Sequence, residues 1–489
     1  MAKVTESIEK YVGSIENLVA KHYKAKAKRR PAPAIPQAPW IAPGESKAGH
    51  WTVGISKQEL VPDDIGSGRY YIAGYYGPKQ VTGMHDPMCA TAIWLDDNAG
   101  KGALVLVSVD CVGFLRHDAD VIRQRLAGWS KQHGCREMHF FGTHNHAGID
   151  TLGLWGKLPK SGRDKKFIQL MQDQICEAIV TAYHTRRCGD LYAGQVGEPE
   201  GYHDDYRLPK VYSKTLTRLR FAPKDGGAPV YLVNYAAHPG MLGSKNTLVS
   251  ADWVYWFRQD MEEKTGGDVI FINGLIGGLI YPHEENPDDV WFSTEFAGHR
   301  IAELALAVSE ERKLEPKIGT MSQDIYLACD NTLLMLGGVL KVIPARMHAT
   351  GEGRFGVSLK SSVNYFEIGN VAEGDSVRIL TVPGEMFPEL AYGGYLPEEE
   401  AGSGSPEQNP APLLELANDP GLVMFGLGDD ELGYIIPPND FFLDEKRPYF
   451  TNGMDQNGRK HYEETVSVGA GAAAVIAETW KEMLERIKT

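Results

Sequence analysis

The sequence predicts an α/β fold with mixed sheets and flanking helices. From about residue 50, short apolar runs of strand length alternate with segments in which apolar residues recur at helical spacing. Turn-forming residues separate these runs, as in the stretch DNAGKG at 97–102. The 489 residues would suit about three domains by length alone, yet large α/β enzymes commonly fill this length with one catalytic unit. We therefore expect one metal-dependent catalytic domain over residues 49–489.

Residues 1–48 precede this domain and differ from it in pattern. Over residues 4–25, apolar side chains fall on one stripe with charges opposite, which predicts an amphipathic helix. The basic, proline-rich segment KAKAKRRPAPAIPQAPWIAPG follows at 24–44. This composition suits an arm that lies over the domain or over a neighbouring subunit. In the second case the chain would form a homo-oligomer. A tether to anionic partners is the alternative.

The predicted elements of the first half alternate regularly. Apolar runs predict strands at 90–95, 103–109 and 138–143, and helical patterns cover 118–133 and 165–184. In the second half, strands are predicted at 230–236, 268–273, 318–328 and 376–382, and helices at 253–264, 292–311 and 466–487. A polar loop spans 397–412, and the segment His203-Asp204-Asp205 is expected to be a surface loop.

Charge and cysteine content exclude several protein classes. A formal net charge of −14 argues against nucleic-acid binding, because phosphates require a basic face. The six cysteines show no CxxC or other paired spacing, which predicts reduced core thiols. We see neither a secretory signal nor an apolar run long enough to span a membrane. These features predict a cytoplasmic enzyme that acts on a small-molecule substrate.

Two histidines stand at the end of the predicted strand 138–143. His144 and His146 are one residue apart, where the apolar run gives way to a glycine-containing loop. On an extended segment two such side chains point to opposite sides. Both can serve one site only if the chain turns here, or if one is a metal ligand and the other a neighbour. The alternative is a polar strand end with solvated histidines.

Two further strand ends release side chains that bind metals. His238 follows the run 230–237, and Glu385 follows the run 380–384; each precedes or follows a Pro-Gly turn. In open α/β sheets, ligands collect beyond the carboxyl ends of strands. Two imidazoles and one carboxylate suit zinc in a catalytic site and leave a position for water or a further ligand. The sequence thus predicts one zinc ion per chain.

Eight segments cover most of residues 70–470, in this order: AGYYGPKQVTGMHDPMCATAIWL, VLVSVDCVG, GTHNHAG, NYAAHPG, LVSADW, VPGEMF, GYIIPP and KHYEE. As an ordered set they resemble the neutral/alkaline non-lysosomal ceramidases. The resemblance implies a ceramidase-like catalytic domain in which His144, His238, Glu385 and Tyr434 hold one zinc ion. It also implies that His146 lies beside the zinc and polarises the scissile carbonyl. His461 and Tyr462 would line the site, and His85 would either line it or be an exposed turn histidine.

The chain departs from that family at two site positions. Members carry an Asn-Ala-Gly-x-x-Ser-Pro-Asn type loop whose serine lies at the reaction centre, whereas this chain reads NGLIGGLI at 273–280, with Gly278 at or near the serine position. The family's H-x-R segment is replaced by His85-Asp86-Pro87-Met88. The usual C-terminal immunoglobulin-like domain has no room after Glu464. These departures predict a substrate other than ceramide.

The expected activity is a zinc-dependent hydrolysis in which metal-activated water attacks an amide-type bond. Tyr434 would donate a proton to the leaving group, and His146 would stabilise the oxyanion. Asp110 and Asp252 would orient the ligand imidazoles, or else serve as a helix cap or turn. The alternative function is a zinc-dependent enzyme, hydrolase or lyase, acting on glycosides, with Tyr434 or His146 as acid or base.

Overall fold

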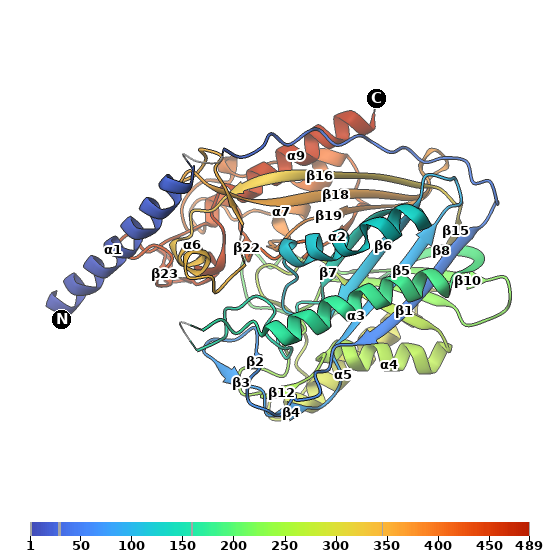
Figure 1. The fold of residues 1–489 in the computed structure, drawn as a ribbon, viewed down its shortest axis with the longest axis horizontal. Helices are drawn as coiled ribbons and strands as arrows, with labels where there is room; N and C mark the ends of the chain where they lie inside the picture. Colours follow the sequence, from blue (N-terminus) through green and yellow to red (C-terminus); the bar gives the residue numbers. More distant parts are fainter. Residues whose placement is uncertain (1, 28–30, 158–159, 345, 489) are drawn as a thin grey trace.

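The computed structural model describes residues 2–27, 31–157, 160–344 and 346–488, with side chains from residue 11 to residue 25 in the first of these stretches. The fold is α/β, with mixed sheets and flanking helices, as predicted. Two large sheets face each other, and helices cover their outer faces (Figure 1). The helices are α1 (Ala2–Ala27), α2 (Arg116–His133), α3 (Lys165–His184), α4 (Trp253–Thr265), α5 (Val290–Leu306), α6 (Thr332–Val339), α7 (Glu389–Tyr392), α8 (Leu413–Ala417) and α9 (Ala472–Ile487).

The larger sheet runs in the order β13-β11-β10-β8-β1-β5-β6-β7, with β15 also paired to β8. Among the described residues of this sheet, the pairs β11–β13 and β6–β7 are parallel and the other pairs are antiparallel. Its strands, counted in the described residues, are β1 (Trp51–Glu59), β5 (Cys89–Asp96), β6 (Ala103–Val109), β7 (Cys135–Gly142), β8 (Arg187–Gly197), β10 (Thr215–Pro223), β11 (Val230–Tyr235), β13 (Asp268–Asn273) and β15 (Glu311–Leu314).

The smaller sheet runs in the order β16-β18-β19-β21, with β17 paired to β18. Its strands are β16 (Ile318–Ala328), β17 (Met347–His348), β18 (Ser358–Asn370), β19 (Asp375–Thr381) and β21 (Val423–Phe425). The remaining strands form short pairs: β2 (Tyr71–Ile72) with β3 (Lys79–Gln80), β4 (Gly83–Met84) with β12 (Leu248–Val249), β9 (His203–Asp205) with β14 (Ile280–Pro282), β20 (Glu385–Met386) with β22 (Tyr434–Ile435), and β23 (Gly453–Met454) with β24 (Lys460–His461).

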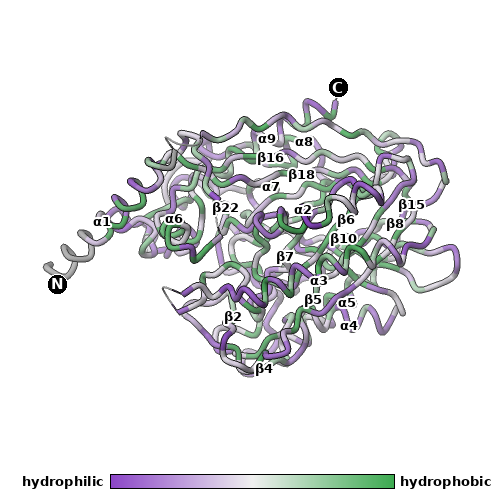
Figure 2. Tube along the Cα trace, viewed as in Figure 1, coloured by the Kyte–Doolittle hydropathy of each residue, from purple (hydrophilic) through white to green (hydrophobic). Residues whose placement is uncertain are grey.

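Alternation along the strands builds the layers. On β6, Leu104 and Leu106 face the core between the sheets, whereas Val105 and Val107 face the core under α2 and α3. Both faces of such a strand are buried, which explains its continuous apolar run. A helix on the surface buries one face, so it needs only one apolar stripe. In Figure 2, hydrophilic and hydrophobic residues accordingly alternate along α3. Trp480 of α9 is fully buried on the outer side of the smaller sheet.

The larger sheet curls so that its two ends approach each other. Ser108 on β6 donates from Oγ to the Phe271 carbonyl on β13 at 2.5 Å, and Asn273 at the end of β13 donates to the Thr143 carbonyl after β7 at 3.0 Å. β13 and β7 are the two ends of the hydrogen-bonded strand order. The curl therefore brings the loops that follow β7 and β11 to one place.

The proline-rich arm lies against the smaller sheet of its own chain. The Ala38 amide donates to Gln323 Oε1 at 2.9 Å, and Ile41 forms an isolated bridge with Thr320 of β16. The Trp40 ring lies 5.9 Å from the ring of Tyr365 on β18. α1 precedes the arm, and its buried residue Tyr23 packs beside α6. The arm thus lies over the smaller sheet of its own chain, one of the two placements that the sequence allows.

Three sequence expectations differ from the structure. The helix predicted at 292–311 ends at Leu306, because Glu311 joins β15, where it accepts hydrogen bonds from Arg218 and Arg220. The helix predicted at 466–487 begins at Ala472, after Gly469, which takes a φ of +145°. His203 is buried on β9 and contacts the Ala236 carbonyl through Nε2 at 2.8 Å, so it is not part of a surface loop.

The six cysteines form no disulfide, and Cys89, Cys111 and Cys329 are buried as expected, whereas Cys188 is exposed. No helix in the described part of the chain combines the length and the apolarity needed to cross a membrane.

A polar cluster, called here the His139 cluster, joins β7 to the loop before β22; it consists of the buried His139 and Asp429 and the half-buried Glu137 and Arg123. His139 Nδ1 lies 2.7 Å from Asp429 Oδ2, and its Nε2 lies 3.3 Å from Glu137 Oε2. Arg123 donates to Asp429 at 2.6 Å. Burial alone would lower the pKa of His139, but Asp429 and Glu137 outweigh it and raise that pKa above its ordinary value. His139 is therefore held as an imidazolium between two carboxylates.

We expect His139→Gln to destabilise the protein most at acidic to neutral pH. Breaking a buried charge pair costs about 3–5 kcal/mol. Because the folded pKa of His139 is raised, its stabilising contribution is complete below its unfolded value of about 6.5 and is lost as pH rises through the folded value. Urea unfolding at several pH values should show the difference from wild type shrinking as pH rises. The exposed His117 gives the control variant His117→Gln, and a gap independent of pH would contradict the assignment.

Candidate metal centre

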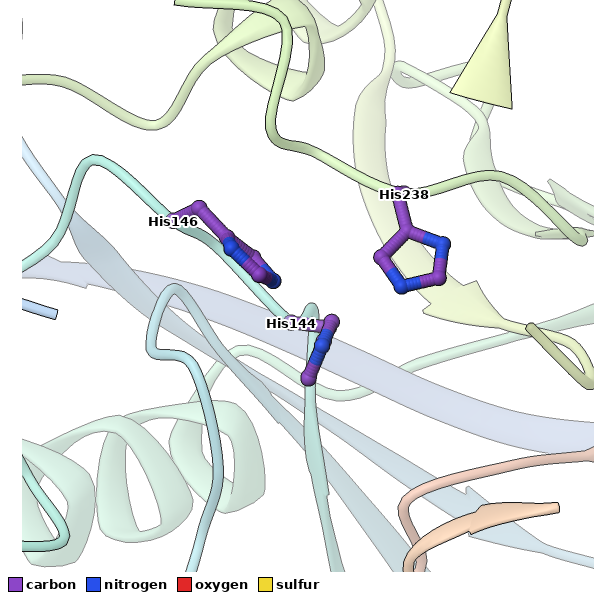
Figure 3. Close-up of side chains that lie close together, drawn as sticks. All are labelled: His144, His146 and His238. Atoms are coloured by element: carbon purple, nitrogen blue, oxygen red, sulfur yellow. The ribbon is translucent and has the colours of Figure 1, made fainter. Parts of the chain in front are cut away.

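Three imidazoles converge beyond the carboxyl ends of β7 and β11. One ring nitrogen from each of His144, His146 and His238 lies within 4.8 Å of the others. Figure 3 shows the three side chains directed toward a common point. The ring centroid of His144 lies 4.6 Å from that of His146 and 5.0 Å from that of His238. All three residues are buried.

The chain turns at His144, which allows both histidines of the motif to face one site. His144 takes a φ of +67°, in the left-handed region that non-glycine residues seldom occupy. The His146 amide then donates to the Pro239 carbonyl at 2.8 Å, which joins the loop after β7 to the loop after β11. Gly74 lies against His146, and a Cβ there would lie 2.4 Å from His146 Nδ1. The strained turn and the close glycine both serve the placement of the imidazoles.

Asn273 fixes the two loops relative to each other. Its side-chain amide donates to the carbonyls of Thr143, at 3.0 Å, and Ala237, at 2.9 Å. Its Oδ1 accepts from the Ala237 amide at 3.1 Å. These are the residues immediately before His144 and His238. One buried amide at the end of β13 therefore sets the spacing of the two histidines.

Backbone carbonyls set the ring orientations. His144 Nδ1 donates to the Val112 carbonyl at 2.6 Å, and His238 Nδ1 donates to the Ile280 carbonyl at 2.9 Å. Each ring thereby keeps its proton on Nδ1 and presents the Nε2 lone pair to the centre. The buried His144 Nε2 and His146 Nε2 have no hydrogen-bond partner among the described residues. Such nitrogens are costly to bury unless a ligand satisfies them.

Glu385 adds a carboxylate to the same point. Its Oε2 lies 3.0 Å from His144 Nε2 and 3.4 Å from His238 Nε2. A carboxylate oxygen and an imidazole lone pair both accept, so facing each other at this distance they repel unless a cation or a proton lies between them. Burial would raise the pKa of Glu385, yet His144 and His238 hold it well below its ordinary range. The geometry therefore calls for positive charge at this point.

Tyrosines surround the centre. Tyr434 is paired with Glu385 across β20 and β22, and its hydroxyl lies 3.1 Å from that of Tyr462. Tyr281 stacks on His238 with ring centroids 4.7 Å apart, and Tyr75 meets His146 edge-on at 5.2 Å. Burial, reinforced by the charge of Glu385, raises the pKa of Tyr434 well above its ordinary value. Without bound metal these phenols keep their protons.

The two predicted aspartates have other partners. Asp110 accepts two hydrogen bonds from Arg258, at 3.0 and 2.6 Å, and one from the Cys89 amide. Asp252 caps α4 through the Trp253 amide and also accepts from the amides of Met241 and Leu242. Neither carboxylate contacts a ligand imidazole. Backbone carbonyls orient those rings instead, and Asp252 takes the helix-capping role that the sequence left open.

The remaining predicted residues lie in distinct surroundings. His85 stacks on Trp291 with ring centroids 4.3 Å apart, and its Nδ1 lies 2.9 Å from Asp86 Oδ2. His461 lies between Glu464, at 2.9 Å, and Asp455, at 3.2 Å. Its neighbour Tyr462 contacts Tyr434. Of these three, Tyr462 is the residue joined to the metal centre by a direct contact in the described structure.

Sequence reasoning missed Asn273, Tyr75, Tyr281 and Glu431. Glu431 is close enough to Glu385 that burial, and then the Glu385 charge, raise its pKa well above the ordinary value. Its Oε1 accepts from the Gly433 amide at 2.7 Å. A signal existed for two of these residues, since Tyr75 lies in the AGYYGP segment and Glu431 lies three residues before Tyr434. Tyr281 and Asn273 flank an apolar loop that carries no such signal.

The residues present fit a divalent metal ion. Imidazole nitrogens together with one carboxylate oxygen form a donor set that zinc accepts, and a phenol can complete it. His144, His238 and Glu385 present free lone pairs to one point, and His146 lies beside them. Carbonyl hydrogen bonds to the outer nitrogens are the arrangement that metal-ligating histidines generally show.

Comparison with known proteins places the fold. Neutral ceramidase from Pseudomonas aeruginosa superposes with a TM-score of 0.66 and 14% sequence identity over 90% of this chain and 75% of that chain. A ceramidase structure described as complexed with C2 gives a TM-score of 0.65, with the same identity and coverage. No protein-family model matches the sequence, and no curated protein matches it. The chain therefore has a ceramidase-like fold.

Proposed function

We propose that this protein is a zinc-dependent hydrolase that cleaves an amide-type bond in a small substrate other than ceramide. The observation that carries the proposal is the approach of Glu385 Oε2 to 3.0 Å from His144 Nε2 and 3.4 Å from His238 Nε2 at one buried point, while the Nδ1 atom of each ring donates to a backbone carbonyl. The fold shared with neutral ceramidase supports the same reaction class.

The bound ion would supply a positive charge that polarises a substrate carbonyl and acidifies a coordinated water. Within the chain, His144, His238 and Glu385 would hold the ion, and Tyr434, paired with Glu385 across β20 and β22, would serve as a fourth ligand or as an acid. His146 can donate an N–H to the carbonyl oxygen as negative charge develops there. The Tyr434 hydroxyl can pass its proton to the leaving nitrogen, with the Tyr462 hydroxyl 3.1 Å behind it.

The substrate proposal rests on the loop between β13 and β14. Gly278 takes a φ of +93°, and the nearest atoms to a Cβ there belong to Arg207, at 3.9 Å. The position thus offers no hydroxyl to a substrate. Pro87 likewise offers no charge at the third position of the segment that begins at His85, where the family that this chain resembles has an arginine. A sphingoid amide would leave polar groups without partners, which costs about 1–3 kcal/mol each.

Long-chain ceramide should therefore be a poor substrate. We expect its kcat/KM to be at least about tenfold below that of the best short polar N-acyl amide, since one missing partner worth 1.4 kcal/mol already gives that factor. The assay compares ceramide, short amides and glycosides at equal concentrations of the zinc-loaded enzyme, with product masses measured. Efficient ceramide cleavage would contradict the substrate proposal and leave the hydrolase proposal standing.

His146→Gln should lower turnover on the best substrate, although glutamine keeps a side chain that can hydrogen-bond.

A second candidate function is a zinc-dependent hydrolase or lyase acting on glycosides. The observation in its favour is the set of phenols around the centre, because Tyr75, Tyr281, Tyr434 and Tyr462 offer aromatic faces and hydroxyls suited to sugars. Tyr434 or His146 would then act as acid or base. Product masses separate the outcomes: hydrolysis adds the mass of water, whereas elimination does not.

A further inference from the structure

The metal centre draws its residues from two parts of the fold. His144 and His238 follow β7 and β11 of the larger sheet. Glu385 and Tyr434 lie on β20 and β22, and Tyr462 follows β24. These last three residues come from the C-terminal part of the chain, and they include the proposed proton donor. A displacement of about 1 Å can cost about 100-fold in rate, so the contacts that join the two parts bear on catalysis.

Arg207 belongs to the histidine side of the centre. It lies just after β9, which pairs with β14. At the first residue of β14, the Ile280 carbonyl accepts from His238 Nδ1, and Tyr281 stacks on the His238 ring. The Arg207 amide donates to Asp205 Oδ1 at 3.0 Å, which ties the loop to the end of β9. Arg207 is thus attached, through β9 and β14, to the residues that hold His238.

The Arg207 guanidinium reaches the tyrosine side of the centre. Its Nη2 donates to Asp440 Oδ2 at 2.6 Å, and its Nη1 lies 2.6 Å from Glu463 Oε1. The side chains of all three residues are at most 11% exposed, so solvent ions screen these charge pairs little. Glu463 directly follows Tyr462 in the chain. The pair with Glu463 therefore holds the backbone beside Tyr462.

The same guanidinium lies against the ring of Phe387. The Arg207 Cζ atom is 4.4 Å from the centre of that ring, which is a cation–π contact. Phe387 directly follows β20, and its ring meets that of Tyr434 edge-on at 5.9 Å. The hydroxyls of Tyr434 and Tyr462, called here the phenol pair, lie 3.1 Å apart. Arg207 thus contacts both neighbours of the phenol pair, Phe387 and Glu463.

Two other roles for Arg207 are less well supported. Its terminal nitrogens already pair with Asp440 and Glu463, and the side chain is 11% exposed, which does not suit direct binding of a substrate anion. A purely stabilising role has little physical basis, because buried ion pairs can often be replaced by apolar side chains without loss of stability. What such a pair does supply is a fixed geometry, since the planar guanidinium holds its acceptors in set directions.

We propose that Arg207 positions the phenol pair for proton transfer to the leaving group. This inference rests on the proposed function. When the C–N bond breaks, the leaving nitrogen keeps the electron pair and takes the Tyr434 proton. The Tyr462 hydroxyl donates a hydrogen bond to the phenolate that remains on Tyr434, and a proton released by the attacking water restores the phenol. Arg207 acts through Glu463 and Phe387 and touches neither the substrate nor the ion, so it is a positioning residue.

Two substrates with the same acyl group test this role in the zinc-loaded enzyme. One is a short alkyl amide, whose leaving nitrogen must be protonated, and the other is a para-nitrophenyl ester, whose leaving group departs without a proton. Arg207→Lys keeps the charge but not the planar fork. It should lower kcat on the amide at least about tenfold, since general-acid catalysis contributes about 10²–10⁴-fold. The KM for the amide and the kcat for the ester should stay nearly unchanged.

Arg218→Lys is the matched control. Arg218 is also a buried arginine, and it pairs with Glu311 at 2.8 Å in the larger sheet. This variant should leave the ratio of amide to ester turnover unchanged, and both variants should keep one zinc ion per chain by elemental analysis. Equal losses on the two substrates, or loss of zinc in Arg207→Lys, would overturn the positioning role. If Arg207→Lys does not fold, Glu463→Gln takes its place with the same expected results.

A measurement without substrate keeps this inference separate from the proposed function. Fluorotyrosine incorporated in place of Tyr462 gives a fluorine resonance that reports on the surroundings of that ring. Arg207→Lys should shift this resonance, whereas Arg218→Lys should not. If the wild-type enzyme cleaves neither substrate, the proposed function fails, and the shift still supports control of the Tyr462 position by Arg207. An unchanged resonance in Arg207→Lys would overturn the inference, whatever the activity.

Discussion

His144→Ala and His238→Ala should each release the metal ion and lower turnover by more than about 100-fold, since losing even an outer partner of a metal ligand typically costs 10–100-fold. Each variant removes one of the lone pairs that face Glu385 and leaves the rest of the centre in place. The fold should survive, because a chain of this size buries a core that does not depend on one site. Elemental analysis should find one divalent ion, most of it zinc, per wild-type chain and little in either variant.

The matched control is His184→Ala, since His184 is exposed in the last turn of α3. It should keep both metal and activity, and circular dichroism should show the same secondary structure in all three variants. Wild-type protein that carries no transition metal, and takes up none on titration, would refute the ligand assignment. Full activity in His144→Ala or His238→Ala would refute it equally.

The sheet and helix layers could be predicted from the sequence, because buried positions recur along the chain with the period of a strand or a helix. Leu104 and Leu106 alternate with Val105 and Val107 between two cores, so both faces of β6 are apolar and the run reads as a buried strand. The same logic places His238 and Glu385 at strand ends. The rule for strand ends and the family resemblance predict that they meet, but the contacts that bring them together could not be predicted, because they depend on the curl of the larger sheet and on Asn273. Long-range curvature leaves no mark in local spacing.

The partners of charged residues were harder still to predict. A single aspartate after an apolar strand fits a metal-orienting role and a structural role equally well, and only the fold shows that Arg258 of α4 reaches Asp110. The carbonyls of Val112 and Ile280 that orient the ligand histidines carry no sequence signal, since every residue has a carbonyl. The predicted end of the helix at 292–311 was wrong because Glu311 pairs with β8 as part of β15, although the helical periodicity of the sequence continues to that residue.

The pair formed by Asp110 and Arg258 is buried on both sides. Asp110 has no exposed surface and Arg258 is 5% exposed. Two hydrogen bonds, at 3.0 and 2.6 Å, join the side chains. Burial lowers the pKa of Arg258, but Asp110 outweighs it and holds the arginine charged. Removing one partner would leave the other charge in the core without compensation.

Asp110→Ala should therefore lower the free energy of unfolding by about 3–5 kcal/mol, the usual cost of breaking a buried pair from one side. The double variant Asp110→Ala with Arg258→Met removes both charges, and it should recover most of that loss. Urea unfolding of the two single variants and the double variant measures the coupling. Zinc content and metal affinity of Asp110→Ala, measured where it remains folded, separate a structural role from a metal-orienting one. An affinity lowered by 10–100-fold, as for lost ligand orientation, with no recovery of stability in the double variant, would show that Asp110 acts on the metal centre.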